Sequence, residues 1–182
     1  MLRKTITLVT SNEDKLESFR NASKNTEINF ERKNIDYPED HDSNSTSEIA
    51  EKGANHCFEK LGEPVIVTDI GLFIDSLNGF PGVNTSFVLD TIGNQGLLKL
   101  LENEENRNAE VKLSIGYCDK ERNFSVTAST KGTITEKQRG EGFGFDPVFR
   151  PKGFDKTFGE DPKMRDRESP RKDAIEKFLK KL

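Results

Sequence analysis

Residues able to bind phosphate stand together near the start of the chain, in the segment Thr10-Ser11-Asn12-Glu13-Asp14-Lys15. Residues 4–10 have the apolar pattern of a strand, and residues 13–23 carry apolar groups at helical spacing. The start of a helix presents unpaired backbone N–H groups and the positive end of the helix dipole, and both favour phosphate. Lys15 adds a positive charge one turn into the helix. The segment therefore predicts a phosphate site, the alternative being a plain helix cap at Ser11 or Asn12 with Lys15 on the surface.

Two acidic residues are candidates for binding a divalent cation beside such a phosphate. Asp69 follows the apolar run 64–67, which is typical of a buried strand, and ligands of open α/β sheets gather at the carboxyl ends of strands. Glu48 lies in the first turn of a predicted helix that ends at Gly62. Mg²⁺ takes one or two carboxylates plus phosphate oxygens, so the pair predicts a site for Mg²⁺, or for Mn²⁺ in its place. The alternatives are an Asp that starts a turn and a Glu that completes a capping box with Ser45.

A third candidate is the segment Phe143-Gly144-Phe145-Asp146-Pro147, inside a loop rich in glycine and aromatic residues at 139–151. Glycines let the backbone approach a ligand closely, and phenylalanine rings can stack on a planar base. The segment predicts a base-binding loop. The alternative is a tight turn whose aromatic rings pack into the core.

The remaining elements must position these residues. A length of 182 residues fits one domain, residues 1–182, with two lobes and no linker. Strands and helices alternate in the first half around a polar loop at 38–47. In the second half a helix is predicted at 95–101, and residues 111–117 and 124–128 predict a hairpin. With a further strand near 133–135 and a C-terminal helix, the pattern predicts an α/β fold with a mixed sheet.

Composition limits the partners. Lys plus Arg total 28 against 32 Asp plus Glu, and the net charge of −4 is unlike that of a protein that binds a nucleic-acid polymer. No apolar run approaches the ~18 residues that a membrane span needs. Cys57 and Cys118 are far apart in the sequence and form no metal-type pair, so both are predicted core residues. We expect a cytoplasmic protein without a nucleic-acid or membrane partner.

Taken together, the motifs resemble those of the inosine triphosphate pyrophosphatase family, also described as Ham1-like. The family's opening Thr-Gly-Asn-x-x-Lys and its central Asp-Ser-Gly-Leu correspond to residues 10–15 and 69–72. Further matches follow in the family's order along the whole chain, at residues 77–82, 91–94, 96–101, 142–147, 156–158 and 169–171.

The resemblance implies a homodimeric enzyme with a twisted central sheet, flanking helices and two lobes around a deep cleft. Such enzymes use Mg²⁺ to hydrolyse ITP, dITP and XTP to the monophosphate and pyrophosphate, which clears these non-standard purine nucleotides from the nucleotide pool. By this resemblance Lys15 and Asp69 are catalytic, and Glu48 and Asp69 bind the metal. The implied substrate-binding residues are Thr10, Ser11, Asn12 and Lys15 at the phosphates, with Phe143, Phe145, Asp146, Arg165, Ser169 and Arg171 at the base.

The chain departs from the family at several of these places. Thr68 stands where an acidic residue usually precedes the metal-binding Asp, and Ile70 replaces the usual Ser. Asn55 replaces a Lys, Arg165 replaces another Lys, and Pro170 replaces the His of Ser-His-Arg. Two alternative functions therefore stay open. One is a weakly catalytic nucleotide-binding homologue that serves as a sensor or partner subunit, and the other is a triphosphate hydrolase with relaxed base selectivity.

Overall fold

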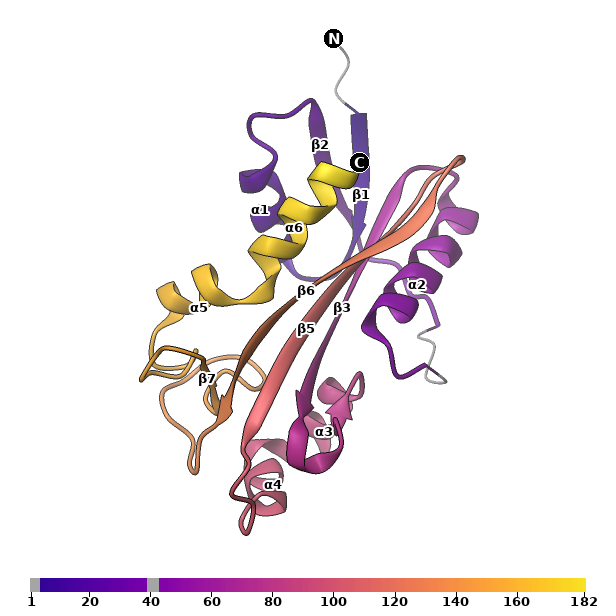
Figure 1. Ribbon diagram of the computed structural model, residues 1–182. Helices are drawn as coiled ribbons and strands as arrows, with labels where there is room; N and C mark the ends of the chain where they lie inside the picture. The colour runs from indigo at the N-terminus through magenta and orange to yellow at the C-terminus, as the bar shows by residue number, and fades with distance from the viewer. Residues whose placement is uncertain (1–3, 39–42) are drawn as a thin grey trace. The chain divides into compact units, whose positions relative to one another are not determined.

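A computed structural model describes residues 4–38 and 43–182 (Figure 1). The elements in chain order are β1 (Lys4–Val9), α1 (Glu13–Ala22), β2 (Ile28–Lys33), α2 (Thr46–Leu61), β3 (Val65–Ile74), the 3₁₀ turn η1 (Asp75–Leu77), β4 (Pro81–Gly82), α3 (Thr85–Thr91), α4 (Gly93–Leu100), β5 (Asn108–Cys118), β6 (Asn123–Ile134), β7 (Phe149–Pro151), α5 (Pro162–Glu168) and α6 (Pro170–Lys181).

The described strands form a seven-stranded sheet in the order β2-β1-β3-β5-β6-β7, with β4 paired to β3. β1 is parallel to β2 and to β3, whereas β3 with β4 and β6 with β7 are antiparallel. The predicted α/β fold with a mixed sheet is confirmed.

Some boundaries differ from the sequence-based expectations. The strand predicted near 133–135 is the far end of β6, which continues to Ile134 without a break. β3 continues through Asp69 to Ile74, so Asp69 lies within a strand and not at its end. Gly62 ends α2 in the left-handed region (φ 68°), as predicted, and its N–H donates to the carbonyl of Phe58. Of the predicted loop 38–47, residues 39–42 lie outside the described residues.

The chain forms two compact units. Unit 1 comprises Met1–Asp69, Leu113–Ala128 and Lys172–Leu182, and unit 2 comprises Ile70–Lys112 and Ser129–Arg171. Three segments of the chain therefore build unit 1, including the C-terminal helix.

The core of unit 1 lies on both faces of its strands. On one face α1 and α6 cover the sheet, and on the other face α2 covers it (Figure 1). Alternation along β3 follows this division, because Ile66 packs with the α1 and α6 side chains while Val65 and Val67 pack with those of α2. Cys57 and Cys118 belong to the α2 side and are buried and free, as predicted.

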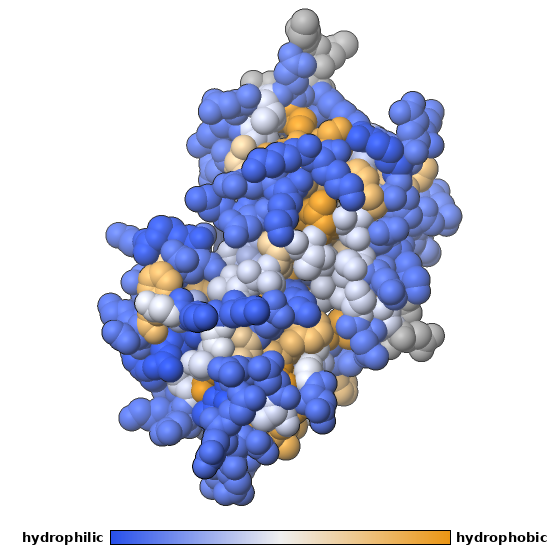
Figure 2. Space-filling model, in the orientation of Figure 1, coloured by the Kyte–Doolittle hydropathy of each residue, from blue (hydrophilic) through white to orange (hydrophobic). Residues whose placement is uncertain are grey.

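Unit 2 has its own core, in which α4 packs with strand residues and with the loop that carries Phe145. Hydrophilic residues cover most of the face in Figure 2, in keeping with a charged share of 33%, and apolar residues form small patches there. Within residues 4–38 and 43–182, every helix is too short or too polar to cross a membrane.

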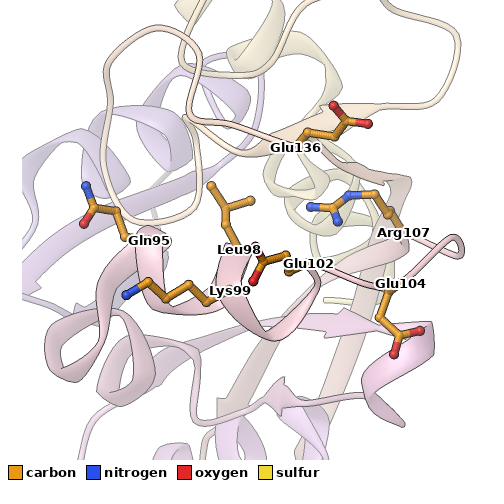
Figure 3. Close-up of a pocket in the computed structure, with 7 residues that line it drawn as sticks. All are labelled: Gln95, Leu98, Lys99, Glu102, Glu104, Arg107 and Glu136. Atoms are coloured by element: carbon orange, nitrogen blue, oxygen red, sulfur yellow. The ribbon is translucent and has the colours of Figure 1, made fainter.

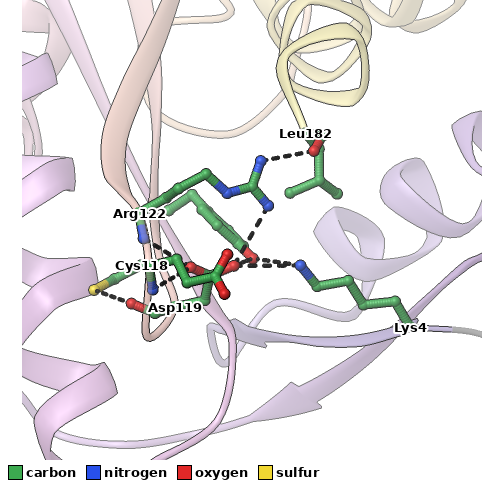
Figure 4. Close-up of polar contacts among 7 residues, drawn as sticks. Lys4, Cys118, Asp119, Arg122 and Leu182 are labelled. Atoms are coloured by element: carbon green, nitrogen blue, oxygen red, sulfur yellow. Dashed lines mark hydrogen bonds and ion pairs between the residues drawn. The ribbon is translucent and has the colours of Figure 1, made fainter.

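A polar network around Asp119 ties three distant parts of unit 1 together (Figure 4). The carboxylate accepts hydrogen bonds from the Tyr117 hydroxyl and from the backbone N–H groups of Glu121 and Arg122, and Lys4 Nζ lies 3.3 Å from its Oδ2. Arg122 also donates to the carbonyl of Leu182, at 2.7 Å. Burial alone raises the pKa of Asp119, but these hydrogen bonds outweigh burial and lower the pKa below its ordinary value.

Asp119→Asn is therefore expected to lower the free energy of unfolding at pH 7 by about 1–2 kcal/mol, because the amide keeps the backbone contacts but loses the charge-assisted ones. A carboxyl with a depressed pKa stabilises the fold above its unfolded pKa of about 3.9 and loses that contribution as the pH falls further. Urea unfolding at pH 7 and pH 3 measures this. The difference from wild type should shrink at pH 3, and Asp90→Asn, at an exposed carboxylate on α3, should change nothing.

Candidate functional site

The twelve residues predicted for the site divide equally between the two units. The first six lie in unit 1, at Thr10, Ser11, Asn12, Lys15, Glu48 and Asp69. The other six lie in unit 2, at Phe143, Phe145, Asp146, Arg165, Ser169 and Arg171.

In unit 1 the turn from β1 into α1 is shaped by its own short polar side chains. Asn12 is the N-cap residue of α1, and its Oδ1 accepts from the backbone N–H of Lys15 at 3.2 Å. The N–H of Asn12 in turn donates to Thr10 Oγ1 at 3.1 Å. Ser11 is exposed, and its carbonyl accepts from Arg32. The capping alternative is thus confirmed for Asn12, and the cap is compatible with anion binding because the helix start still presents its positive dipole end.

Lys15 reaches across from α1 to β3. Its Nζ donates to Thr68 Oγ1 at 3.2 Å, in a partly buried contact. The register explains the meeting: Leu8 of β1 pairs with Ile66 of β3, so Thr68 lies level with the turn that follows β1. Thr68 shares the α1 face of the sheet with Ile66 by alternation, and this places it under the first turn of α1.

Asp69 points the other way. It alternates with Thr68 and therefore shares the α2 face with Val67. Its Oδ2 is shielded from solvent. Asp69 thus lies within β3, level with the turn that follows β1, on the face of the sheet opposite to α1 and Lys15.

This end of the sheet is a topological switch point. β1 lies between β2 and β3, and the chain passes through α1 on one face and through α2 on the other. In open α/β sheets ligands bind outside the carboxyl ends of the strands at such a point. The sequence could not predict this switch point, because the face of the sheet that α1 or α2 covers depends on the order of the strands.

Glu48 is exposed on the first turn of α2, and the predicted capping box is wrong in detail. Ser45 is the N-cap residue but makes no side-chain capping hydrogen bond, and its hydroxyl lies 3.0 Å from that of Ser47. The Glu48 carboxylate instead accepts from Ser43 Oγ at 2.8 Å. Ser43 Oγ also accepts from the backbone N–H of Ser45 at 3.1 Å, which is the contact that a capping box assigns to the Glu48 carboxylate.

The described residues contain no group of three or more His, Cys, Asp or Glu side chains placed to hold a metal. Mg²⁺ needs only one or two carboxylates when phosphate oxygens and water complete its shell. Shielded Asp69 and exposed Glu48 are oxygen donors of the required kind. In chemical kind, these two carboxylates therefore suit a cation whose remaining ligands are phosphate oxygens and water.

In unit 2, one carboxylate organises the predicted base-binding loop. Asp146 is 4% exposed, and its Oδ2 lies 2.8 Å from Arg165 Nε and accepts from the backbone N–H of Phe143 at 3.2 Å. Burial raises the pKa of Asp146, while the charges of Arg165 and Arg171 act in the opposite direction. Asp146, Arg165 and Arg171 are thus brought into one electrostatic group.

The two phenylalanines of the loop have different surroundings. Phe143 is 85% exposed, so its ring is available for stacking. Phe145 is 9% exposed and meets the Phe149 ring edge-on, which is the core packing that the sequence left open as an alternative. Between them Gly144 has φ 63°, a left-handed conformation that separates the directions of the two rings.

Ser169 and Pro170 form the junction between α5 and α6. The N–H of Ser169 donates to the carbonyl of Arg165 at 2.9 Å, closing α5, and Pro170 is the first residue of α6. Proline suits this position because its missing N–H would have no partner within the helix.

Two residues that contact the predicted site residues were not predicted from the sequence. One is Thr68 as the partner of Lys15. The other is Asn94 on α4, whose side-chain amide donates to the carbonyl of Gly144 at 2.8 Å and so fixes the loop. Asn94 belongs to a matched segment, 91–94, and a polar residue inside such a segment was the available signal.

A separate hollow of about 520 Å³ in unit 2 contains none of the predicted residues (Figure 3). Its lining combines three glutamates with Lys99 and Arg107. Arg107 is committed to structure, because it donates to the carbonyls of Leu101, Ile134 and Thr135. This hollow is therefore not the site predicted from the motifs.

Comparison with known proteins agrees with the motifs. A dITP/XTP pyrophosphatase of Methanopyrus kandleri is 55% identical over 135 residues, which cover 73% of this chain and 71% of that protein. A dITP/XTP pyrophosphatase of Methanothermobacter marburgensis is 40% identical over 176 residues, covering 95% and 93%. The structure of a HAM1 protein from Coxiella burnetii superimposes with a TM-score of 0.89 at 27% identity, covering 98% of this chain and all (100%) of that one. The model of the Ham1 family matches residues 6–181, and the chain belongs to this family.

Proposed function

We propose that this protein is a nucleoside triphosphate pyrophosphohydrolase that converts dITP, ITP and XTP to the monophosphate and pyrophosphate. The observation that carries the proposal is the similarity, over nearly the whole chain, to relatives named dITP/XTP pyrophosphatase. The placement of Lys15 at the start of α1, beside the switch point of the sheet, supports it independently.

In the proposed reaction, water attacks the α-phosphorus, the bond to the bridging oxygen breaks, and pyrophosphate leaves. Thr10, Asn12 and the first N–H groups of α1 bind the phosphate tail, and Lys15 stabilises the negative charge that develops on it. Asp69 orients the attacking water and accepts its proton. Glu48 and Asp69 are the residues that would hold Mg²⁺, and the bound ion would neutralise charge on the phosphate oxygens.

The base is held by the group in unit 2. The exposed Phe143 ring stacks on the purine, and donors from Arg165, Ser169 and Arg171 face its polar edge. Hypoxanthine and xanthine present an acceptor oxygen where adenine presents an amino group. Adenine would therefore leave these donors unpaired, which is an effective basis for rejection.

The proposal includes a cytoplasmic homodimer. Exposed apolar side chains of unit 2 support a second copy as partner, since Phe87 is 70% exposed and Phe80 and Ile92 are also exposed.

A pyrophosphate-release assay with Mg²⁺ tests the function. We expect kcat/KM for ITP, dITP and XTP to exceed that for ATP by about a hundredfold or more. Tight ITP binding without pyrophosphate release would establish the sensor or partner-subunit alternative. Equal rates for ATP and ITP would establish relaxed base selectivity.

A further inference from the structure

The loop that presents the Phe143 ring is built in a way that needs an anchor outside the loop. Gly142 and Gly144 flank Phe143 with φ angles of 149° and 63°, which residues with side chains rarely adopt. Glycine loses more conformational freedom on ordering than any other residue, so this Gly-Phe-Gly tip is costly to hold in one shape. The Phe143 ring is 85% exposed and gains little packing energy that would offset the cost.

Asn94 on α4 provides such an anchor. Its Nδ2 donates to the carbonyl of Gly144 at 2.8 Å, in a partly buried contact between residues 50 positions apart in the chain. The helix itself is well fixed, because the fully buried Leu97 of α4 packs in the core of unit 2 together with Phe145. The hydrogen bond therefore ties the tip of the loop to a helix whose position the core determines.

Stability alone does not explain an amide at position 94. Asn94 Oδ1 is shielded from solvent and has no hydrogen-bond partner among the described residues. A buried acceptor without a partner lowers stability, because it has lost its water without gaining a replacement. Leucine has a similar shape and would avoid this cost. The benefit of the amide must therefore come from the bond that its other end makes to Gly144.

We propose that Asn94 is a positioning residue that holds the base-binding loop in its binding conformation and so sets the affinity for the purine, with no effect on phosphate binding. The inference rests on the proposed stacking of Phe143 on the base and deepens it. Without the anchor, the Gly-Phe-Gly tip would populate several conformations, and the apparent affinity for the base would fall with the fraction that remains competent. Asn94 acts through Gly144 and does not touch the substrate.

The test uses Asn94→Leu, which keeps the shape of the side chain and removes both the donor and the unpaired acceptor. We expect the dissociation constant of IMP, measured by calorimetry, and KM for ITP to rise by about fivefold to tenfold. The inhibition constant of inorganic pyrophosphate, which carries no base, and kcat at saturating ITP should stay within about twofold of wild type. The midpoint of thermal unfolding should stay within about 3 °C of wild type, whereas a merely structural role would lower it and weaken both ligands.

A second variant and a double-mutant cycle sharpen the test. Asn94→Asp also keeps the shape but sets a carboxylate against the Gly144 carbonyl, so IMP binding should weaken at least as much as in Asn94→Leu. In a Phe143→Ala background, Asn94→Leu should have no further effect on IMP binding, since the ring that it positions is gone. Gln95→Leu, at an exposed residue of the same helix, is the matched control and should bind IMP as wild type does.

Three results would overturn the inference: unchanged IMP affinity in both Asn94 variants, an equal loss of pyrophosphate affinity, or an undiminished effect of Asn94→Leu in the Phe143→Ala background. Asn94→Ala replaces the leucine variant if the latter does not fold. Failure of the proposed function is a separate result, because it is a wild-type protein that releases no pyrophosphate from any triphosphate, whatever the IMP affinities are.

Discussion

Lys15→Met is expected to reduce kcat/KM for ITP by about a thousandfold, the cost of removing one preorganised group that stabilises developing charge. Its ammonium lies at the first turn of α1, held by Thr68, at the end of the sheet where ligands of this architecture bind. Methionine keeps the length and apolar stem of the side chain and removes only its charge and hydrogen bonds. Steady-state kinetics with ITP and Mg²⁺ measure the effect.

The loss should appear in both kcat and KM, because the charge acts on bound substrate and on the transition state. Lys15→Arg should recover only part of the activity, since a planar guanidinium does not reproduce a compact ammonium. Lys24→Met, at an exposed lysine beyond the end of α1, is the control and should behave as wild type. Wild-type kinetics in the Lys15→Met enzyme would contradict the assignment of the phosphate site to the start of α1.

Asp69→Asn is expected to lower kcat by about a thousandfold, within the range for removal of a general base. The amide has nearly the same shape, but it cannot accept a proton and is a weaker ligand for Mg²⁺. The Mg²⁺ concentration that gives half-maximal rate should therefore rise together with the loss of kcat. Rates measured across a Mg²⁺ titration at saturating ITP give both numbers.

The control for this substitution is Asp75→Asn, at an exposed carboxylate in the 3₁₀ turn that follows β3. It should leave kcat and the Mg²⁺ requirement unchanged. Undiminished activity in Asp69→Asn, with the usual Mg²⁺ requirement, would contradict the assignment of Asp69 to the metal and to the base.

Local patterns were sufficient for much of the fold. The strict alternation at 111–117 and the turn after it predicted the hairpin of β5 and β6, because a period of two is a strong signal over that length. The helix α3, at Thr85–Thr91, was not predicted, since seven residues are too few to show helical periodicity. The continuation of β3 past Asp69 was missed because it depends on pairing with β4, a two-residue strand.

The site was predictable as a set of residue types but not as a set of contacts. The segment 10–15 was placed correctly between a strand and a helix, because its neighbours carry clear periodicities. The bond from Lys15 to Thr68 depends on the register between two strands that are distant in the chain. Likewise, the opposite surroundings of Phe143 and Phe145 follow from a left-handed glycine and a buried carboxylate, which have no signature in the order of residues.

The shared use of one oxygen atom in unit 2 has an evolutionary consequence. Asp146 Oδ2 meets both the Arg165 guanidinium and the main chain at Phe143, so neither contact can be altered without disturbing the other. Mutations at 146 and 165 are therefore expected to be epistatic. A mutant library designed to change nucleobase preference should vary positions 146 and 165 together. A single substitution would leave either the charge at the other position without its ion-pair partner or the backbone N–H of Phe143 without its acceptor.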